Sequence, residues 1–298
     1  MSKHIGMIDV DGHNYPNLAQ MKISAWHKAK GDHVEWYTGM RWYDRVYKSK
    51  VFTFSRDWDS CVTSEDVVCG GTGYHDDKPL PAEVEHMMPD YSLYNITDTA
   101  YGFLTRGCPR GCGFCIVGNK EGRKSVKVAD LREFWNGQRN IVLNDPNILA
   151  CKDREQLLCS LINSGAWVDF NQGLDARMLD KDTCLLLRDV KYKQIHFAWD
   201  RYNEGDVIID RLLEYSRYNP RHTPNNHIVY TLVNYDTTLE QDLDRIYRLR
   251  DIGYWAYVMI YDKPHADKVY TRLQRWVNNR FIFSKCCKFE DYENYISN

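Results

Sequence analysis

The chain lacks long apolar segments and an excess of charge of either sign. No stretch of its 298 residues approaches the run of about 20 apolar positions that a membrane-spanning helix needs, so we expect no membrane partner. The net charge of −2 excludes a basic field over the whole surface, and a nucleic acid would need a local patch. The N-terminus, MSKHIGMIDV, has no apolar core with a cleavage site of the secretory type, which predicts a cytoplasmic protein.

Cysteine is present at ten positions, and no disulfide is expected, because the predicted compartment keeps thiols reduced. Five of these residues lie in or beside apolar runs and are predicted to be buried free thiols: Cys61, Cys69, Cys151, Cys159 and Cys184. The vicinal pair Cys286–Cys287 is weak evidence for a second site.

The remaining cysteines, Cys108, Cys112 and Cys115, form a C-x₃-C-x₂-C array in the stretch YGFLTRGCPRGCGFCIVG at 101–118. Three thiolates within eight residues can converge on one metal centre, since the glycines among them let the backbone wrap tightly. An iron–sulfur cluster needs four ligands, usually all cysteine. A loop that supplies three predicts a cluster with one iron left for another ligand.

A structural zinc site is the main alternative for this loop. Such a site requires a fourth Cys or His at a matching spacing, commonly a second C-x₂₋₄-C pair. None lies nearby, although Cys286–Cys287 could reach back from the far end of the chain. The three-cysteine spacing fits no common zinc pattern, and we favour the cluster.

This loop, with the aromatic Phe114 just before the third cysteine, resembles the cluster loop of the radical S-adenosylmethionine (SAM) superfamily. The resemblance implies that Cys108, Cys112 and Cys115 hold a [4Fe–4S] cluster whose fourth iron is chelated by the amino and carboxylate groups of SAM. It also implies an electron donor such as flavodoxin or ferredoxin. Reductive cleavage of SAM would then give methionine and a 5′-deoxyadenosyl radical that abstracts hydrogen from a substrate.

Strand-like and helix-like runs alternate from residue 100 to 285. The predicted strands are centred near Gly102–Leu104, Asn140–Leu143, Trp167–Phe170, Gln194–Ala198, Ile228–Val233 and Ala256–Ile260. Among the predicted helices, Arg154–Ser164 is capped by Asp153 and ends at Gly165. Another opens with the capping box Thr238-x-x-Gln241. Six parallel units are too few for an eight-stranded barrel and predict an open, partial (β/α)₆ barrel, the core shared by the radical SAM family.

The first 75 residues predict a small Rossmann-like domain. A strand at Ile5–Val10 precedes a helix from about Pro16 to Lys30, with proline at its first position. Further strands are predicted at Val34–Tyr37, Asp44–Tyr47 and Asp66–Cys69. The two connections between these strands are too short or too polar for a covering helix.

This segment resembles the cobalamin-binding domain that precedes many radical SAM barrels. The matches to its motifs are Asp11-Gly12-His13, Ser49-Lys50-Val51 and Gly70–Gly71. Pro16 stands where the first motif has glycine, Val51 replaces a leucine, and two helices are missing. We therefore predict a degenerate cobalamin-binding-type domain in which bound cobalamin is possible but disfavoured. His13 is expected instead to cap the helix start or to line an interdomain cleft.

Polar groups follow several predicted barrel strands, where ligands of parallel βα folds gather. Asn144, Asp145 and Asn147 resemble the D-D-N-F segment of cobalamin-type radical SAM relatives, and Gln172, Asp175 and Arg177 resemble their N-Q-G-x-D-x-R segment. The resemblance implies contacts with the ammonium, ribose and carboxylate of SAM. A plain turn and a structural Asp175–Arg177 pair remain the alternatives. Trp199 and Tyr261 follow later strands and are predicted to face adenine or substrate, or else to pack.

We predict four segments: the Rossmann-like domain at 1–75, a connector at 76–100, the radical SAM partial barrel at 101–280 and a tail at 281–298. The predicted function is a radical SAM enzyme whose substrate could be a nucleic acid, a peptide or a small molecule. A basic run after the loop could serve a nucleic acid, although a solvated surface is the favoured interpretation: Lys120, Arg123, Lys124 and Lys127. The rivals are a cobalamin-dependent radical SAM methyltransferase and a non-catalytic iron–sulfur protein in electron transfer or sensing.

Overall fold

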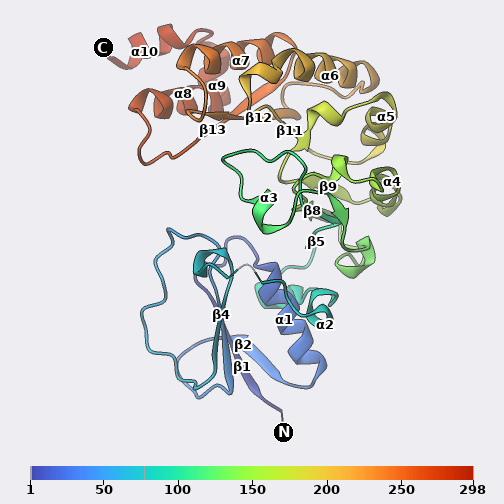
Figure 1. The fold of residues 1–298 in the computed structure, drawn as a ribbon, viewed down its shortest axis with the longest axis vertical. Coiled ribbons are helices and arrows are strands. Elements are labelled where there is room, and N and C mark those ends of the chain that lie inside the picture. Colours follow the sequence, from blue (N-terminus) through green and yellow to red (C-terminus); the bar gives the residue numbers. More distant parts are fainter. Residues whose placement is uncertain (1, 77, 298) are drawn as a thin grey trace. The chain divides into compact units, whose positions relative to one another are not determined.

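A computed structural model describes residues 2–76 and 78–297 of the chain. Met1, Asp77 and Asn298, which the predicted segments include, lie outside the described residues. The chain divides into two compact units, Met1–Gly102 with Ala129–Ile141, and Phe103–Val128 with Val142–Asn298. Both combine parallel strands with helices, so the predicted α/β class is confirmed (Figure 1).

The first unit contains a parallel four-stranded sheet in the order β2-β1-β3-β4. Its strands are β1 (His4–Asp9), β2 (His33–Trp36), β3 (Arg45–Ser49) and β4 (Val67–Gly70). All four lie within two residues of their predicted positions. The unit also contains η1 (Thr72–Tyr74), α2 (Ala82–Glu85), η2 (Tyr91–Tyr94), η3 (Leu131–Glu133) and strand β5 (Thr99–Gly102).

Helix α1 (Leu18–Ala29) is the main helix of this unit, and its start differs from the prediction. Leu18, not Pro16, is the first helical residue, and Asn17 is the N-cap, because its side chain accepts a hydrogen bond from the backbone N–H of Gln20 at 3.2 Å. The predicted capping role of His13 is likewise wrong. His13 instead stacks on Trp36, with ring centroids 4.0 Å apart.

The two faces of the first sheet are covered differently. On one face Ile5 and Met7 pack with Ile23 of α1 and Leu93 of η2. On the other face the buried cluster Ile8, Tyr37, Tyr43 and Val46 is closed by loop residues such as Val62. Neither connection, at 37–44 or 50–66, contains a helix, as predicted.

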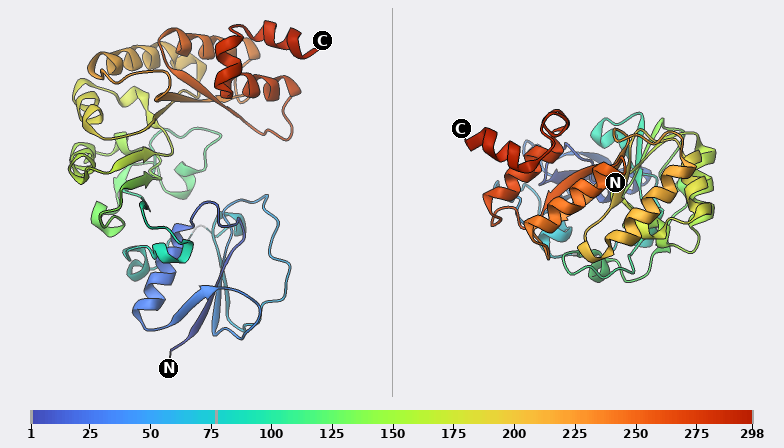
Figure 2. Two further views of the ribbon diagram at one scale, coloured as in Figure 1. Left: turned by 180° about the vertical axis from the view of Figure 1, so that it is seen from behind. Right: turned by 90° about the horizontal axis from the view of Figure 1, so that it is seen from above.

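The second unit contains a parallel sheet in the order β10-β11-β12-β13. These strands are β10 (Leu174–Asp175), β11 (Ile195–Ala198), β12 (His227–Val233) and β13 (Trp255–Ile260). Figures 1 and 2 show helices α6 (Gly205–Tyr218), α7 (Leu239–Asp251) and α8 (Lys268–Asn278) along one side of this sheet. Helix α5 (Lys181–Asp189) and the 3₁₀ turns η5 (Ala176–Met178) and η6 (Tyr202–Glu204) connect the strands.

A separate three-stranded sheet has the order β5-β8-β9, with β8 at Asn140–Leu143 and β9 at Trp167–Phe170. The division between the two units falls within β8. In the described chain, the predicted barrel strands are therefore distributed over two sheets. The first of these strands was predicted at Gly102–Leu104 but lies at Thr99–Gly102.

The helix signals in the sequence are largely confirmed. The capping box of Thr238 and Gln241 forms at the start of α7. Helix α4 spans Arg154–Ser164 as predicted and ends at Gly165, whose φ of 65° is the left-handed conformation that glycine favours. Asp153 is the N-cap residue of α4 as predicted, but its side chain makes no capping hydrogen bond.

The five cysteines predicted to be buried divide into two groups. Cys151 and Cys184 are buried, whereas Cys61, Cys69 and Cys159 are exposed. On α4 the core side is formed by Leu157, Leu158 and Leu161, and Cys159 therefore falls on the outer side. None of the helices in the described part of the chain is long and apolar enough to span a membrane.

The C-terminal tail forms α9 (Arg280–Lys285) and α10 (Phe289–Ser297). Phe283 of α9 contacts Trp276 of α8, with ring centroids 4.7 Å apart, and Trp255 of β13 at 5.1 Å. The tail therefore packs on α8 and at β13, the edge strand of the sheet. The remaining short elements of the second unit are β6 (Thr105–Arg106), α3 (Val117–Lys120), β7 (Val126–Lys127) and η4 (Ile148–Ala150).

A buried polar cluster at the start of β12 centres on His227, whose side chain is fully enclosed. Its Nε2 lies 3.2 Å from the Tyr192 hydroxyl and 3.3 Å from the Asn219 amide nitrogen, and its Nδ1 lies 2.5 Å from Asn226 Oδ1. Burial, together with the neighbouring His222, lowers the pKa of His227 to about 3. The folded protein therefore keeps this imidazole neutral.

Acid is expected to destabilise the second unit through His227. Below pH 6.5 the unfolded chain takes up a proton that the folded chain refuses until about pH 3, so the free energy of unfolding falls as pH falls through this window. The loss from this group is about 2 kcal/mol at pH 5. Urea unfolding at pH 7 and pH 5 measures it. His227→Gln should reduce this loss of stability in acid, whereas His265→Gln, at an exposed position, should not. If the free energy of unfolding had the same pH dependence in the unmodified chain and in both variants, the prediction would be contradicted.

Candidate active site

The cysteine loop is an excursion between two short antiparallel strands, β6 and β7, of the second unit. The Cys108 backbone N–H donates to the Gly122 carbonyl at 3.1 Å, which brings the two arms of the loop together. Gly107 has a φ of 84°, and a side chain there would collide with the Lys124 carbonyl. Glycine is therefore required at this turn by both conformation and space.

Asp145 anchors the start of this loop. Its Oδ2 accepts from the Leu104 backbone N–H at 3.1 Å, and its Oδ1 accepts from both the Thr105 backbone N–H and hydroxyl, at 2.5 and 2.6 Å. Burial raises the pKa of Asp145 to about 6, although these hydrogen bonds act in the opposite direction. In this structure the carboxylate holds the backbone of the loop, while its predicted contact with SAM stays a prediction.

The three cysteines of the loop are each half-buried. Burial raises the pKa of the Cys112 thiol, as does the negative charge of Asp200. Among the described residues, no three His, Cys, Asp or Glu side chains are gathered in the way a bound metal ion requires, so the thiols share a loop without converging on one point. The basic side chains after the third cysteine are exposed at Lys120, Arg123 and Lys124 and half-buried at Lys127.

Aromatic rings line the loop on one side. Phe114 meets Tyr235 edge to face at 5.1 Å, and Tyr235 meets Tyr261 in the same way at 4.9 Å. A side chain at Gly113 would strike the Tyr235 hydroxyl, so the loop backbone lies directly against this ring. Tyr235 and Tyr261 follow β12 and β13 and are 37% and 41% exposed. The predicted residues Phe114 and Tyr261 thus belong to one accessible aromatic row.

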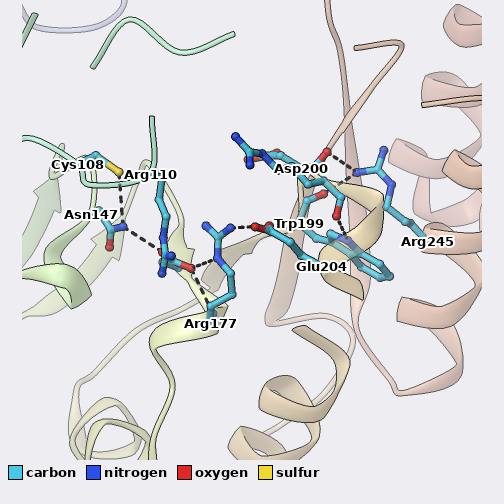
Figure 3. A network of polar contacts seen from close by, with 10 residues as sticks. Cys108, Arg110, Asn147, Arg177, Trp199, Asp200, Glu204 and Arg245 are labelled. Atoms are coloured by element: carbon cyan, nitrogen blue, oxygen red, sulfur yellow. Dashed lines mark hydrogen bonds and ion pairs between the residues drawn. The ribbon is translucent and has the colours of Figure 1, made fainter. Parts of the chain in front are cut away.

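A polar network connects the loop to the ends of the neighbouring strands (Figure 3). The Asn147 amide nitrogen lies 3.6 Å from Cys108 Sγ and donates to Asp175 Oδ2 at 3.1 Å. Arg110, between the first two cysteines, donates to the same carboxylate oxygen at 2.5 Å. Asp175 therefore joins the cysteine loop to β10.

Arg177 extends the network in the other direction. Its Nε donates to Asp175 Oδ1 at 2.7 Å and its guanidinium pairs with Glu204 at 2.5 Å. Burial acts to raise the pKa of Asp175, but the hydrogen bonds and charges of Arg177 and Arg110 outweigh it and hold this pKa below its ordinary value. The predicted Asp175–Arg177 pair is present, and it forms part of a larger array of charged groups.

Sequence reasoning missed Arg110, Asp200 and Glu204. Arg110 lies between two of the predicted cluster ligands, and this position was the available signal for it. Asp200 and Glu204 follow β11, at the carboxyl end of a parallel strand, where ligands of such folds gather. Nothing in their local sequence distinguishes them from ordinary surface acids.

Three predicted residues contribute no side chain to the contacts around Asp175. The Asn144 side-chain oxygen accepts a hydrogen bond from Asn171 at 3.1 Å. Gln172 is exposed beside a cavity on the second sheet. Trp199 is completely buried and its indole N–H donates to the Arg201 carbonyl at 2.8 Å. Its predicted place beside adenine or substrate is therefore not supported, because the ring packs in the interior.

A fully buried arginine, Arg245, holds the ends of two strands of the second sheet. Arg245 of α7 donates to the carbonyls of Trp199 at 2.7 Å and Leu232 at 2.6 Å, after β11 and within β12. It also pairs with Asp242 at 2.5 Å, and neither side chain of this pair is exposed. The ends of two strands are thus fixed to one helix by a single guanidinium.

The donor chemistry of the loop fits an iron–sulfur cluster with one iron open to another ligand. Thiols are the protein ligands that such clusters prefer, and the loop supplies three of them. Cys108 also has a hydrogen-bond donor beside its sulfur, from Asn147. Hydrogen bonds to cysteine sulfur are one of the means by which proteins tune cluster potentials.

No protein-family model matches the chain, and no curated protein matches it either. The assignment of a function therefore depends on the residues of this chain.

The central carboxylate gives a stability prediction. Asp175→Asn keeps the shape of the side chain but removes the buried negative charge that Arg110 and Arg177 share, so that Arg177 keeps only Glu204. We expect the free energy of unfolding to fall by about 2–3 kcal/mol. This expected loss is smaller than the loss for a fully buried ion pair, because both guanidinium groups are partly exposed. Urea unfolding measures it. Asp206→Asn, in an exposed ion pair with Arg248, should cost no more than about 1 kcal/mol, and equal losses would contradict the interpretation.

Proposed function

We propose that this chain is a radical SAM enzyme. The observation that carries the proposal is a three-cysteine loop whose first thiol contacts a network of carboxylate, amide and guanidinium groups at the ends of parallel strands. Cys108, Cys112 and Cys115 would hold a [4Fe–4S] cluster. When bound, this cluster supplies an electron that cleaves the sulfonium of SAM to methionine and a 5′-deoxyadenosyl radical.

The residues around the loop have the chemistry to bind the rest of SAM. The guanidinium of Arg177 has five N–H groups, more than its contacts with Asp175 and Glu204 use, and its planar fork suits a carboxylate. Asn147 and Asp175 bring amide and carboxylate groups suited to an ammonium or to ribose hydroxyls. The half-exposed rings of Tyr235 and Tyr261 offer apolar surface for adenine.

The fold supports this proposal at two further points. We propose that β5, β8, β9, β11, β12 and β13 are the strands of an open, partial (β/α)₆ barrel, with the cysteine loop following the first of them. The strand order β2-β1-β3-β4 of the first unit is also the order that begins flavodoxin-like doubly wound sheets. This favours a reduced cobalamin-binding-type domain at 1–75, and the connector at 76–100 and the tail at 281–298 stay predictions.

Cobalamin is disfavoured as a second cofactor. One face of the sheet in the first unit is closed by loops and aromatic side chains in place of helices. His13, the residue of the first cobalamin motif, stacks on Trp36. A cobalamin-dependent methyltransferase therefore remains the second candidate, and the non-catalytic iron–sulfur protein is the third.

Anaerobic reconstitution with iron and sulfide, followed by dithionite and SAM, tests the proposal. We expect 5′-deoxyadenosine and methionine as products, and a change in the electron paramagnetic resonance signal of the cluster when SAM is added. A flavodoxin or ferredoxin should replace dithionite as electron donor. Bound zinc, or a cluster whose electron paramagnetic resonance signal does not change when SAM is added, would overturn the proposal in favour of a non-catalytic protein. A corrinoid absorption spectrum would favour the methyltransferase.

A further inference from the structure

A cavity lies on the side of the β10–β13 sheet that faces away from its helices. Alternate strand residues point to opposite faces. Phe197 and Val229 are fully buried on the helix side, whereas their neighbours His196 and Tyr230 line the cavity. Its volume is about 400 Å³, and all of the residues that form it belong to the second unit.

Three rings form an aromatic surface in this cavity. His196 and Tyr230 stack nearly parallel, with 6° between their planes and 4.9 Å between their centroids. Tyr257 meets Tyr230 edge to face at 5.8 Å and is 44% exposed, so its ring is accessible from solvent. Ile228 and Met259 add apolar surface beside them. A flat ligand can stack on such a surface without regard to its substituents.

The polar groups of the cavity are uncharged amides. Asn171, Gln172 and Gln194 line it, and none of its described lining residues is Lys, Arg, Asp or Glu. Amide side chains donate and accept hydrogen bonds, as the edges of nucleobases do. Phosphate and carboxylate ligands are disfavoured, since no cation compensates their charge.

His196 provides one further polar group. Its Nδ1 lies 3.6 Å from Asp169 Oδ1, and both atoms are buried without a hydrogen-bond partner. This distance exceeds that of a hydrogen bond, but a small rotation of either side chain would close it. A proton on Nδ1 would then face Asp169, which leaves Nε2 as a hydrogen-bond acceptor for a ligand N–H.

We infer that this cavity binds a nucleobase, stacked on Tyr257 and hydrogen-bonded through its edge to the amides and His196. The substrate class of the enzyme would accordingly be a nucleoside or a nucleotide in a nucleic acid whose phosphates stay outside the cavity. That the nucleoside is the substrate of the enzyme rests on the proposed function. That the cavity binds a nucleobase does not depend on the proposed function.

Calorimetric titration of the full chain, without added iron, tests the inference. The probes are guanosine, cytidine and uridine, with ribose as the control; adenosine is left out because it resembles part of SAM. At least one nucleoside is expected to bind with a Kd below about 1 mM, and ribose is not. Tyr257→Ala should weaken this binding about tenfold through loss of a stacking contact, and Tyr257→Phe should restore it.

Two further variants make the result specific. Tyr15→Ala removes a tyrosine of similar exposure from the other unit and should leave nucleoside binding unchanged. His196→Phe keeps a ring for stacking but loses the acceptor, and should weaken binding about fivefold. Absence of nucleoside binding, or equal binding by Tyr257→Ala, would overturn the inference. SAM cleavage without nucleoside binding would refute this inference alone, and nucleoside binding without SAM cleavage would refute only the proposed function.

Discussion

Replacing Cys112 with alanine is expected to abolish the formation of 5′-deoxyadenosine from SAM. The loop supplies three thiols, and two cannot hold a cluster that needs all three and an external ligand on the fourth iron. The half-buried Cys112 side chain is small, so alanine should leave the fold of the iron-free protein intact. Chromatography of the reaction products and the iron content per chain after reconstitution measure the effect.

Cys159→Ala is the matched control, because Cys159 is an exposed thiol on the outer side of α4. It should keep the iron content and the product yield of the unmodified chain. If Cys112→Ala retained full iron and full SAM cleavage, the thiol set proposed for the cluster would be wrong.

Arg245→Met is expected to lower the free energy of unfolding by about 3–5 kcal/mol, the range for removal of one partner from a buried ion pair. Asp242 would be left as a buried carboxylate without its counter-charge. The carbonyls of Trp199 and Leu232 would also lose their hydrogen-bond donor. Methionine fills a comparable volume, so the loss reports the polar contacts more than a cavity. Urea unfolding at pH 7 measures it.

Arg248→Met provides the control on the same helix. Arg248 is one-third exposed and pairs with Asp206, whose side chain is 94% exposed. Exposed ion pairs contribute about 0–1 kcal/mol, so this substitution should have a small effect. Similar losses for the two variants would show that Arg245 acts through general packing of α7 and not through its buried contacts.

The local signals of the sequence predicted individual elements well. The capping box at Thr238 and the glycine stop of α4 are confirmed because both depend on backbone groups a few residues away. Asp153 occupies the N-cap position of α4 but makes no capping hydrogen bond, because residue type alone does not determine where a side chain turns. Likewise Cys159 sits in an apolar run, yet the phase of the helix turns it outward.

The candidate site was predictable by residue type but not by contact. The sequence placed Asn147, Asp175 and Arg177 at strand ends, where the structure joins them into one network with Cys108. Which side chains face a ligand depends on packing between distant segments. For this reason the burial of Trp199 under Arg248 and the structural contacts of Asp145 could not be read from spacing.

The short segment after β8 makes two contacts with the cysteine loop through residues two positions apart. Asp145 accepts hydrogen bonds from the backbone at the start of the loop, and the Asn147 amide lies beside the first thiol of the loop. An insertion or deletion at 144–146 would therefore displace the root of the loop and the neighbour of its sulfur together. Length changes during evolution should therefore be rare in the segment after β8.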